Sequence, residues 1–179
     1  VLADEPDGIR IEGLLADEGI GTGHCPRHAG KAPTSYVTLN TRNGSRTIVH
    51  HRDLAELAFE EFARIDLEAF DWLHFEGRNV EATRRMMARA GDLHPELPVS
   101  LEVEKARDGI EALFPLAELL LFSRAYAREL GYDEPGAFLE AMREAAPHAR
   151  LACGWGEAGA FGLARGDQLL HAPASPPEQ

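Results

Sequence analysis

The sequence is poor in basic side chains and contains almost no lysine. Its 179 residues include 18 Lys and Arg against 30 Asp and Glu, so the formal charge is −12 at pH 7 with neutral histidine, and the pI lies near 5.1. Proteins that bind nucleic acid neutralise its phosphates with clustered Lys and Arg. We therefore expect no nucleic-acid partner. Lysine occurs only at Lys31 and Lys105, which makes Lys105 easy to single out.

Signals of secretion and of membrane insertion are also lacking. Two cysteines, Cys25 and Cys153, are too few for a disulfide framework, which favours a reducing compartment. The longest apolar run, 113–122, is interrupted by Pro115 and Glu118 and is shorter than the ~20 residues that span a bilayer. The N-terminus has neither the basic nor the apolar stretch of a signal peptide. We therefore expect a cytoplasmic protein with no membrane segment.

What the chain does contain is enough apolar surface for one ordinary core. Hydrophobic residues make up 44% of it, and a chain of this length buries roughly 70% of the surface that it exposes when unfolded. A single compact domain is the expected arrangement.

The first third of the chain predicts a helix, a hairpin and a second helix. Residues 8–19 are expected to form a short helix closed by Gly19, since glycine adopts the left-handed conformation of a helix end at no steric cost. Two β-rich runs, 34–41 and 45–51, are joined by a turn that contains Asn-Gly, which is the strongest short-range signal of a hairpin. Apolar residues at helical spacing then predict an amphipathic helix over 54–65.

After residue 70 strands and helices alternate. The predicted strands are 72–76, 99–104, 118–122 and 149–154, and the predicted helices are 79–90, 108–114, 123–131 and 135–146. Asn79 and Ser123 are candidate N-caps, and Gly91 is the expected end of the first of these helices. Regular alternation of this kind indicates parallel strands with crossover helices, an α/β architecture. A second hairpin is expected over 160–171, before an irregular Pro-rich end.

Charged residues follow two of the predicted strands at their carboxyl ends, where ligand sites of open α/β sheets collect. Glu102 and Glu104 share a face of an otherwise buried strand, with Lys105 next to them. Charge there is costly unless it is paired or used. Either these groups bind a ligand, or a Glu–Lys pair at the rim satisfies itself.

The same reasoning applies where the first of these strands ends, at Glu76-Gly77-Arg78-Asn79. A guanidinium beside the free N–H groups of a helix N-terminus favours an anion site. The alternative is an Arg78–Glu76 ion pair with Asn79 as an ordinary cap.

Two further motifs are weaker. Gly154-Trp-Gly156-Glu-Ala-Gly159 has the spacing of a dinucleotide fingerprint, but a hairpin rather than a helix is predicted to follow it. The better interpretation is a strand end that a ligand or other backbone can approach closely. His24-Cys25-Pro-Arg-His28 provides half of a zinc site at most, and no second pair of ligands follows at zinc spacing, so a solvated loop is favoured.

Several segments together resemble a known family. They are Asn43-Gly-Ser-Arg-Thr-Ile-Val49, Phe62-Ala-Arg-Ile-Asp66, Trp72-Leu-His-Phe-Glu-Gly-Arg-Asn79, Val99-Ser-Leu-Glu-Val-Glu-Lys105 and Cys153-Gly-Trp-Gly-Glu-Ala-Gly159. Their order and approximate spacing, from about Ile11 to Pro177, resemble those of the ketohexokinases, the fructokinase branch of the ribokinase-like (PfkB) sugar kinases.

The resemblance implies a kinase that moves the γ-phosphoryl group of ATP to the 1-hydroxyl of a ketohexose such as fructose, with ATP and Mg²⁺ as cofactors. The implied fold is a ribokinase-like three-layer α/β sandwich with a mostly parallel sheet and a small β lid, which pairs with the lid of a second subunit in a homodimer. Residues 34–51 would be the hairpin of that lid, and residues 1–33 and 52–179 parts of the α/β kinase core.

The resemblance also assigns site residues. Arg46 matches an arginine that reaches from the lid toward the phosphates or the sugar. The matching polar groups near the triphosphate are Glu76, Arg78, Glu104 and Lys105, and the turn against which the nucleotide lies matches Trp155, Gly156, Glu157 and Gly159. Phosphoryl transfer requires positive groups and backbone N–H donors that stabilise the charge on the migrating phosphoryl group.

Three departures from the family pattern limit this expectation. The sugar-binding Asp and Asn segment and the Gly-Ala-Gly-Asp motif with the general base have no match here, and Ser123-Arg-Ala-Tyr126 stands where many relatives have an Asn-x-x-Glu magnesium motif. We therefore expect that these 179 residues alone neither phosphorylate sugar nor hold ATP well. Two alternatives stay open: a non-catalytic truncated homologue that acts only as a dimerisation module, and a PfkB kinase for another sugar or a nucleoside.

Overall fold

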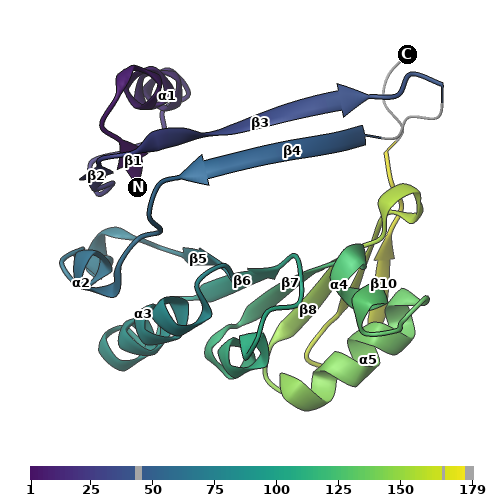
Figure 1. The fold of residues 1–179 in the computed structure, drawn as a ribbon. Coiled ribbons are helices and arrows are strands. Elements are labelled where there is room, and N and C mark those ends of the chain that lie inside the picture. The colour runs from purple at the N-terminus through teal and green to yellow at the C-terminus, as the bar shows by residue number, and fades with distance from the viewer. Residues whose placement is uncertain (43–45, 167, 176–179) are drawn as a thin grey trace. The chain divides into compact units, whose positions relative to one another are not determined.

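The computed structural model describes residues 1–42, 46–166 and 168–175. The chain forms two compact units, 1–65 and 66–179, where composition predicts one (Figure 1). The first unit is small and built around a long hairpin. The second is an α/β layer structure.

The first unit contains the predicted hairpin. Its elements are β1 (Leu2–Ala3), α1 (Pro6–Asp17), β2 (Arg27–His28), β3 (Lys31–Leu39), β4 (Arg46–Asp53) and α2 (Phe59–Phe62). Strands β3 and β4 are antiparallel, with Leu39 opposite Arg46, so the hairpin is confirmed, and its turn lies outside the described residues. Gly19 has a φ of 74° just beyond the end of α1, as the sequence predicts.

The helix predicted over 54–65 is wrong, because only the single turn α2 forms there. Leu54 follows the end of β4 directly and is buried with Ala3 and Ala32 in the small core of this unit. The Glu61 carboxylate accepts the N–H of Ala58 at 2.9 Å, so helical structure begins only after Ala58. Burial of Leu54 in this core therefore prevails over the tendency of residues 54–65 to form a helix, which their apolar spacing had indicated.

The second unit is a six-stranded sheet with helical connections. Its elements are η1 (Leu67–Ala69), β5 (Leu73–Glu76), α3 (Val80–Leu93), β6 (Val99–Val103), η2 (Ile110–Leu116), β7 (Leu119–Ser123), α4 (Arg124–Glu129), α5 (Pro135–Ala145), β8 (Arg150–Gly154), η3 (Gly156–Ala158), β9 (Ala160–Leu163) and β10 (Leu169–Ala172). The strand order is β10-β9-β8-β7-β6-β5. Strands β5 to β8 are parallel, and β9 and β10 are antiparallel to their neighbours. The predicted α/β fold with a mostly parallel sheet is confirmed.

The helices of this unit cover one face of the sheet. Because β5 to β8 follow one another in chain order, right-handed crossovers carry every connection across the same face. Figure 1 shows α3, α4 and α5 on that side. The core between the two layers includes Leu101, Val103, Leu120 and Phe138, which are fully buried.

Local capping chemistry sets the helix starts. The side-chain oxygen of Asn79 accepts the N–H of Ala82 at 3.3 Å, and the Ser123 hydroxyl accepts the N–H of Tyr126 at 3.0 Å, so both predicted N-caps are confirmed. The predicted stop at Gly91 is wrong, since α3 continues to Leu93. Gly91 does not have the positive φ that would end a helix there. The helical turn or two predicted over 108–114 forms as the 3₁₀ helix η2.

No helix among the residues described in the two units has both the length and the apolarity that crossing a bilayer requires.

Candidate functional site

The carboxyl ends of the four parallel strands lie along one edge of the sheet. Glu76 is paired with Glu102 in the β5–β6 register, and Ser123 is paired with Gly154 in the β7–β8 register. The segments that follow these strands, 77–79, 104–107 and 155–159, are therefore at the same edge, together with Arg124. The structure thus places Arg78, Lys105 and Gly156 along one edge, as the sequence predicts.

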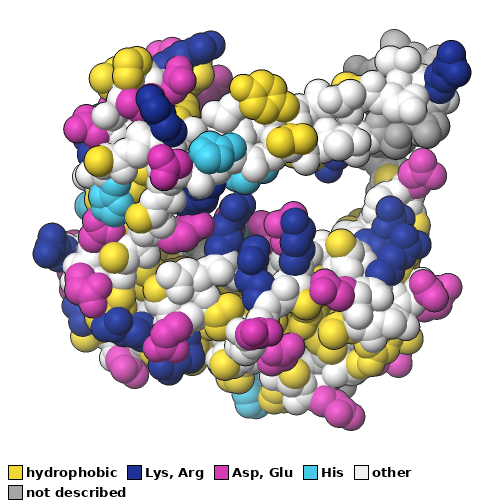
Figure 2. All heavy atoms as spheres, in the orientation of Figure 1, with side chains coloured by type: hydrophobic (Ala, Val, Ile, Leu, Met, Phe, Trp, Pro, Cys, Tyr) yellow, Lys and Arg dark blue, Asp and Glu magenta, His cyan; other side chains and the backbone are white. Residues whose placement is uncertain are grey.

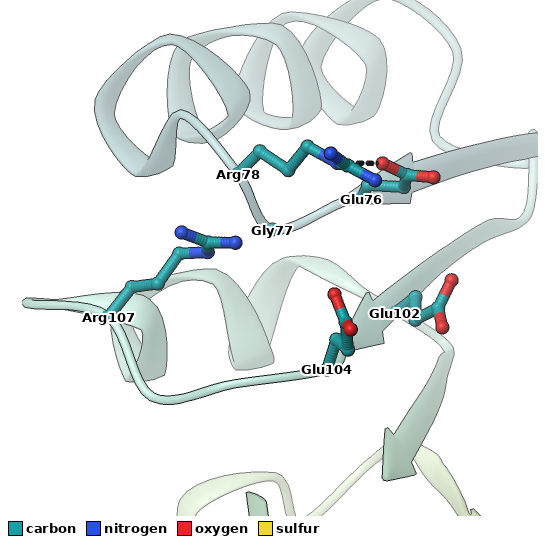
Figure 3. Close-up of a pocket in the computed structure, with 6 residues that line it drawn as sticks. All are labelled: Glu76, Gly77, Arg78, Glu102, Glu104 and Arg107. Atoms are coloured by element: carbon teal, nitrogen blue, oxygen red, sulfur yellow. Dashed lines mark hydrogen bonds and ion pairs between the residues drawn. The ribbon is translucent and has the colours of Figure 1, made fainter. Parts of the chain in front are cut away.

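A pocket of about 220 Å³ opens at this edge between the ends of β5 and β6 (Figure 3). The residues that line it are Glu76, Gly77, Arg78, Glu102, Glu104 and Arg107. The N–H of Gly77 donates to the carbonyl of Glu102 at 3.1 Å, which holds the two strand ends together. A Cβ at Gly77 would lie 2.8 Å from Cδ1 of Ile110, so glycine allows this close approach.

The charges of the pocket are partly balanced within it. Arg78 forms an ion pair with Glu76, both side chains being well exposed, and Figure 3 shows the guanidinium turned toward that carboxylate. Since Asn79 also caps α3, both features of the simpler sequence interpretation are present. They do not remove Arg78 from the pocket, because Arg78 and Glu76 both line it.

Lys105 does not line the pocket. Its ammonium nitrogen lies 3.9 Å from Oε1 of Glu104, and its side chain is 64% exposed, so it forms the rim pair that the sequence allows as an alternative.

Arg107 lines the pocket and was missed by the sequence analysis. Its guanidinium reaches from the loop after β6 into the space between Gly77 and Glu104 (Figure 3). No ion pair joins it to another described residue within 4.0 Å. The signal that could have found it is a basic residue in the loop that follows the carboxyl end of a buried strand.

The glycine-rich turn after β8 is a tight 3₁₀ turn. The N–H of Trp155 donates to the carbonyl of Gly159 at 2.7 Å, and the N–H of Gly159 donates to the carbonyl of Gly156 at 2.8 Å. Strand β9 begins at Ala160, so no helix starts at the third glycine and the dinucleotide fingerprint is excluded, as the sequence predicts. Glu157 is exposed on this turn.

Trp155 differs from its neighbours in this turn. Its side chain is 8% exposed and belongs to the core between sheet and helices. A nucleotide lying against the turn would therefore meet the exposed Gly156 and Glu157 rather than the indole.

Arg124 connects the neighbouring strand end to this turn. Its Nη1 donates to the carbonyl of Trp155 at 3.5 Å, and a Cβ on Gly156 would lie 3.2 Å from the same nitrogen. Sequence reasoning noted this residue only as part of the string 123–126. Tyr126, the last residue of that string, is fully buried. Burial and the nearby Glu111 raise the pKa of its hydroxyl to about 12, and the ring packs in the core between the sheet and the helices.

The remaining candidates lie in the first unit. Arg46 is the exposed first residue of β4 and is described within that unit alone.

His28 ends the segment that could have provided half of a zinc site. Its Nε2 lies 2.5 Å from Oε1 of Glu61. The backbone N–H of Ala58 and the ring of His28 lower the pKa of the Glu61 carboxyl. Across the described parts of both units, no three His, Cys, Asp or Glu residues are grouped so that they could hold a metal ion.

Comparison with known proteins identifies the fold and a relative. A scan against models of protein families finds no match. The chain is 35% identical to the ketohexokinase of Mus musculus over 159 residues, which cover 83% of this chain and 52% of the relative. The chain thus spans about half the length of this relative.

Two solved structures share the arrangement of elements. A ribokinase from Cryptococcus neoformans in complex with ADP matches with a TM-score of 0.77 at 16% identity over 98% of this chain and 60% of that one. A fructokinase from Vibrio cholerae with fructose, ADP and calcium bound matches with a TM-score of 0.67 at 18% identity over 99% and 62%. The chain is therefore a homologue of ketohexokinase, and its fold is that of the ribokinase-like (PfkB) carbohydrate kinases.

Proposed function

We propose that this protein is an ATP-dependent carbohydrate kinase that transfers the γ-phosphoryl group of ATP to the 1-hydroxyl of a ketohexose such as fructose. The observation that carries the proposal is the convergence of a charged pocket and a glycine-rich turn at one sheet edge, in a chain 35% identical to a ketohexokinase.

The pocket supplies cationic groups for the triphosphate. Phosphoryl transfer is catalysed mainly by positioning and by stabilising charge on the phosphoryl oxygens. Arg78 and Arg107 face the pocket from the loops after β5 and β6, and guanidinium groups match phosphate oxygens in a planar fork. We assign the triphosphate to this pocket, with Lys105 at its rim. A role of Arg46 in binding the phosphates or the sugar stays a prediction.

The glycine-rich turn is assigned to the rest of the nucleotide. Gly156 is exposed, and the guanidinium of Arg124 lies beside the position that a Cβ would take, so a ligand can reach the backbone from the side that Arg124 leaves open. Glu157 is exposed beside it and is available to the polar groups of the nucleotide.

Magnesium is assigned to the nucleotide rather than to a protein site. Mg²⁺ is commonly held by one or two carboxylates together with substrate phosphates, and the described residues contain no group of three metal-binding side chains. The carboxylates available in the pocket are Glu76, Glu102 and Glu104. When bound, the ion neutralises charge on the phosphate oxygens.

We place the protein in the cytoplasm, since both cysteines are free thiols.

The kinase assignment predicts a defined kinetic result. In the protein expressed from its intact reading frame, Arg107→Met is expected to lower kcat/KM for ATP about 100-fold, because it removes a cation from the phosphate pocket. ADP release coupled to a panel of ketohexoses, other sugars and nucleosides measures the activity. The control is Arg150→Met, which changes an exposed arginine at the opposite end of the same sheet.

Each outcome of this assay decides a separate point. Absence of ADP release with every acceptor would overturn the kinase assignment and favour the non-catalytic alternative. Turnover with a nucleoside but not with ketohexoses would reassign the substrate. Equal activity of the Arg107 and Arg150 variants would show that the triphosphate does not occupy this pocket.

We also propose that the hairpin β3–β4 is a lid that pairs with the lid of a second copy. Tyr36 is opposite Val49, and Val37 is opposite Ile48, so apolar side chains stand on both faces of the ribbon. All four are at least half exposed, and Figure 2 shows hydrophobic side chains standing on the visible face of the hairpin. A two-stranded ribbon is marginally stable by itself, and exposed apolar patches of this kind mark interaction surfaces.

Dimerisation through this surface can be tested by introducing a charged side chain into it. Val37→Lys is expected to convert a dimer to a monomer in sedimentation velocity, because an ammonium group would be buried at the interface. Leu93→Lys, at the end of α3, is the matched control on an exposed apolar residue of the other unit. A wild-type monomer, or dissociation by both variants, contradicts the assignment.

A further inference from the structure

A histidine in the edge strand β10 contacts the glycine-rich turn after β8. Nε2 of His171, in β10, lies 2.8 Å from the carbonyl oxygen of Ala158, the last residue of η3. A carbonyl oxygen only accepts, so Nε2 is the protonated nitrogen that donates. The ring also stacks on Phe161 of β9, with centroids 4.4 Å apart and planes 18° apart. Its orientation is thus determined by two contacts.

The backbone at the end of β10 packs closely against the same turn. A Cβ on Gly159 would lie 2.1 Å from the carbonyl oxygen of Ala172 and 2.7 Å from the backbone nitrogen of Ala174. From the other side, Arg124 reaches the carbonyl of Trp155. The turn is therefore held between the β7–α4 junction and the β10 strand.

The hydrogen bond from His171 restrains the peptide group between Ala158 and Gly159. The carbonyl of Ala158 belongs to the same peptide plane as the N–H of Gly159, which donates to the carbonyl of Gly156. Holding this carbonyl sets the direction of that N–H and hence the shape of the exposed backbone at Gly156. Glycine by itself supplies no such restraint, because it populates many backbone conformations.

We propose that His171 is a positioning residue for nucleotide binding. Its Nε2–H donates to Ala158 and its ring stacks on Phe161, which together hold the Gly156–Gly159 turn in the shape that receives the nucleotide. This inference rests on the proposed function, in which the nucleotide lies against that turn. His171 itself does not touch the nucleotide.

Two variants separate the two contacts of His171. His171→Phe retains a ring that can stack but removes the donor, whereas His171→Gln retains a donor of similar reach. The control is His148→Phe, which changes an exposed histidine just before β8, at the amino-terminal end of the parallel strands and away from the glycine-rich turn. In the protein expressed from its intact reading frame, His171→Phe is expected to raise KM for ATP about fivefold. The kcat and the KM for the sugar should stay unchanged, and His171→Gln should restore most of the ATP affinity.

A second measurement does not depend on activity. Amide hydrogen exchange at Gly159, measured without nucleotide, is expected to become faster in His171→Phe than in His148→Phe. Unchanged exchange would overturn the positioning role. Faster exchange with unchanged KM for ATP would also overturn it, while leaving the kinase assignment intact. If no variant or wild-type protein releases ADP, the proposed function fails, and the exchange rates still decide whether His171 holds the turn.

Discussion

Replacing Gly159 by alanine is expected to lower the free energy of unfolding by about 3 kcal/mol, because two costs add at this position. The residue has a φ of 88° and a ψ of −138°, which side chains other than that of glycine rarely adopt. A Cβ would also lie 2.1 Å from the carbonyl oxygen of Ala172. That atom is backbone, so relief requires β10 to move away from the turn.

The matched control is Gly154→Ala, five residues earlier. A methyl group at Gly154 would have no other atom within 4 Å, and the residue does not have a positive φ. Alanine there is expected to change stability by no more than about 0.5 kcal/mol. Urea unfolding of both variants measures the difference. Equal midpoints for the two would mean that β10 does not constrain the turn as the structure shows.

Removal of the Arg143 guanidinium is expected to cost about 3 kcal/mol of stability, because several charge-assisted hydrogen bonds are lost together. Arg143 lies in the last turn of α5. Its guanidinium donates to the carbonyl oxygens of Ala146 at 3.0 Å, Ala149 at 2.6 Å, Leu163 at 3.3 Å and Ala164 at 2.9 Å. One side chain therefore joins the end of a helix to the start of β8 and the end of β9.

Arg143→Met is the informative variant, since methionine retains much of the aliphatic stem and loses only the donors. Arg143→Lys should recover less than half of the loss, because an ammonium group has three donors and lacks the planar fork. Arg128→Met, in the last turn of α4, removes an exposed arginine and serves as the control. Thermal unfolding ranks the three variants. A loss for Arg143→Met no greater than that of Arg128→Met would contradict this account.

Features that depend on a few adjacent residues were predictable. The Asn-Gly turn between two β-rich runs predicted the β3–β4 hairpin, and the side chains of Asn79 and Ser123 predicted the starts of α3 and α4. Each depends on contacts within four residues or on a local backbone preference. The alternation of these elements then predicted the parallel sheet, since crossover connections allow few other arrangements.

Features that depend on contacts between distant segments were not predictable. Helical spacing over 54–65 predicted the wrong element because Leu54 packs against Ala3 and Ala32, which are remote in the chain. Trp155 stands in the predicted turn, but the burial of its side chain in the core was not predicted.

By itself the sequence determined the order of strands and helices, the sheet edge at which charged loops gather, and the likeness to sugar kinases. Periodicity, caps and turn residues act over short distances, and parallel topology brings the carboxyl ends of strands together. Only the tertiary structure decided which charged groups meet: Arg107 lines the pocket and Lys105 does not, and Arg124 and His171 both reach the glycine-rich turn. The reach of a long side chain depends on the packing around it, and that packing involves residues far apart in the sequence.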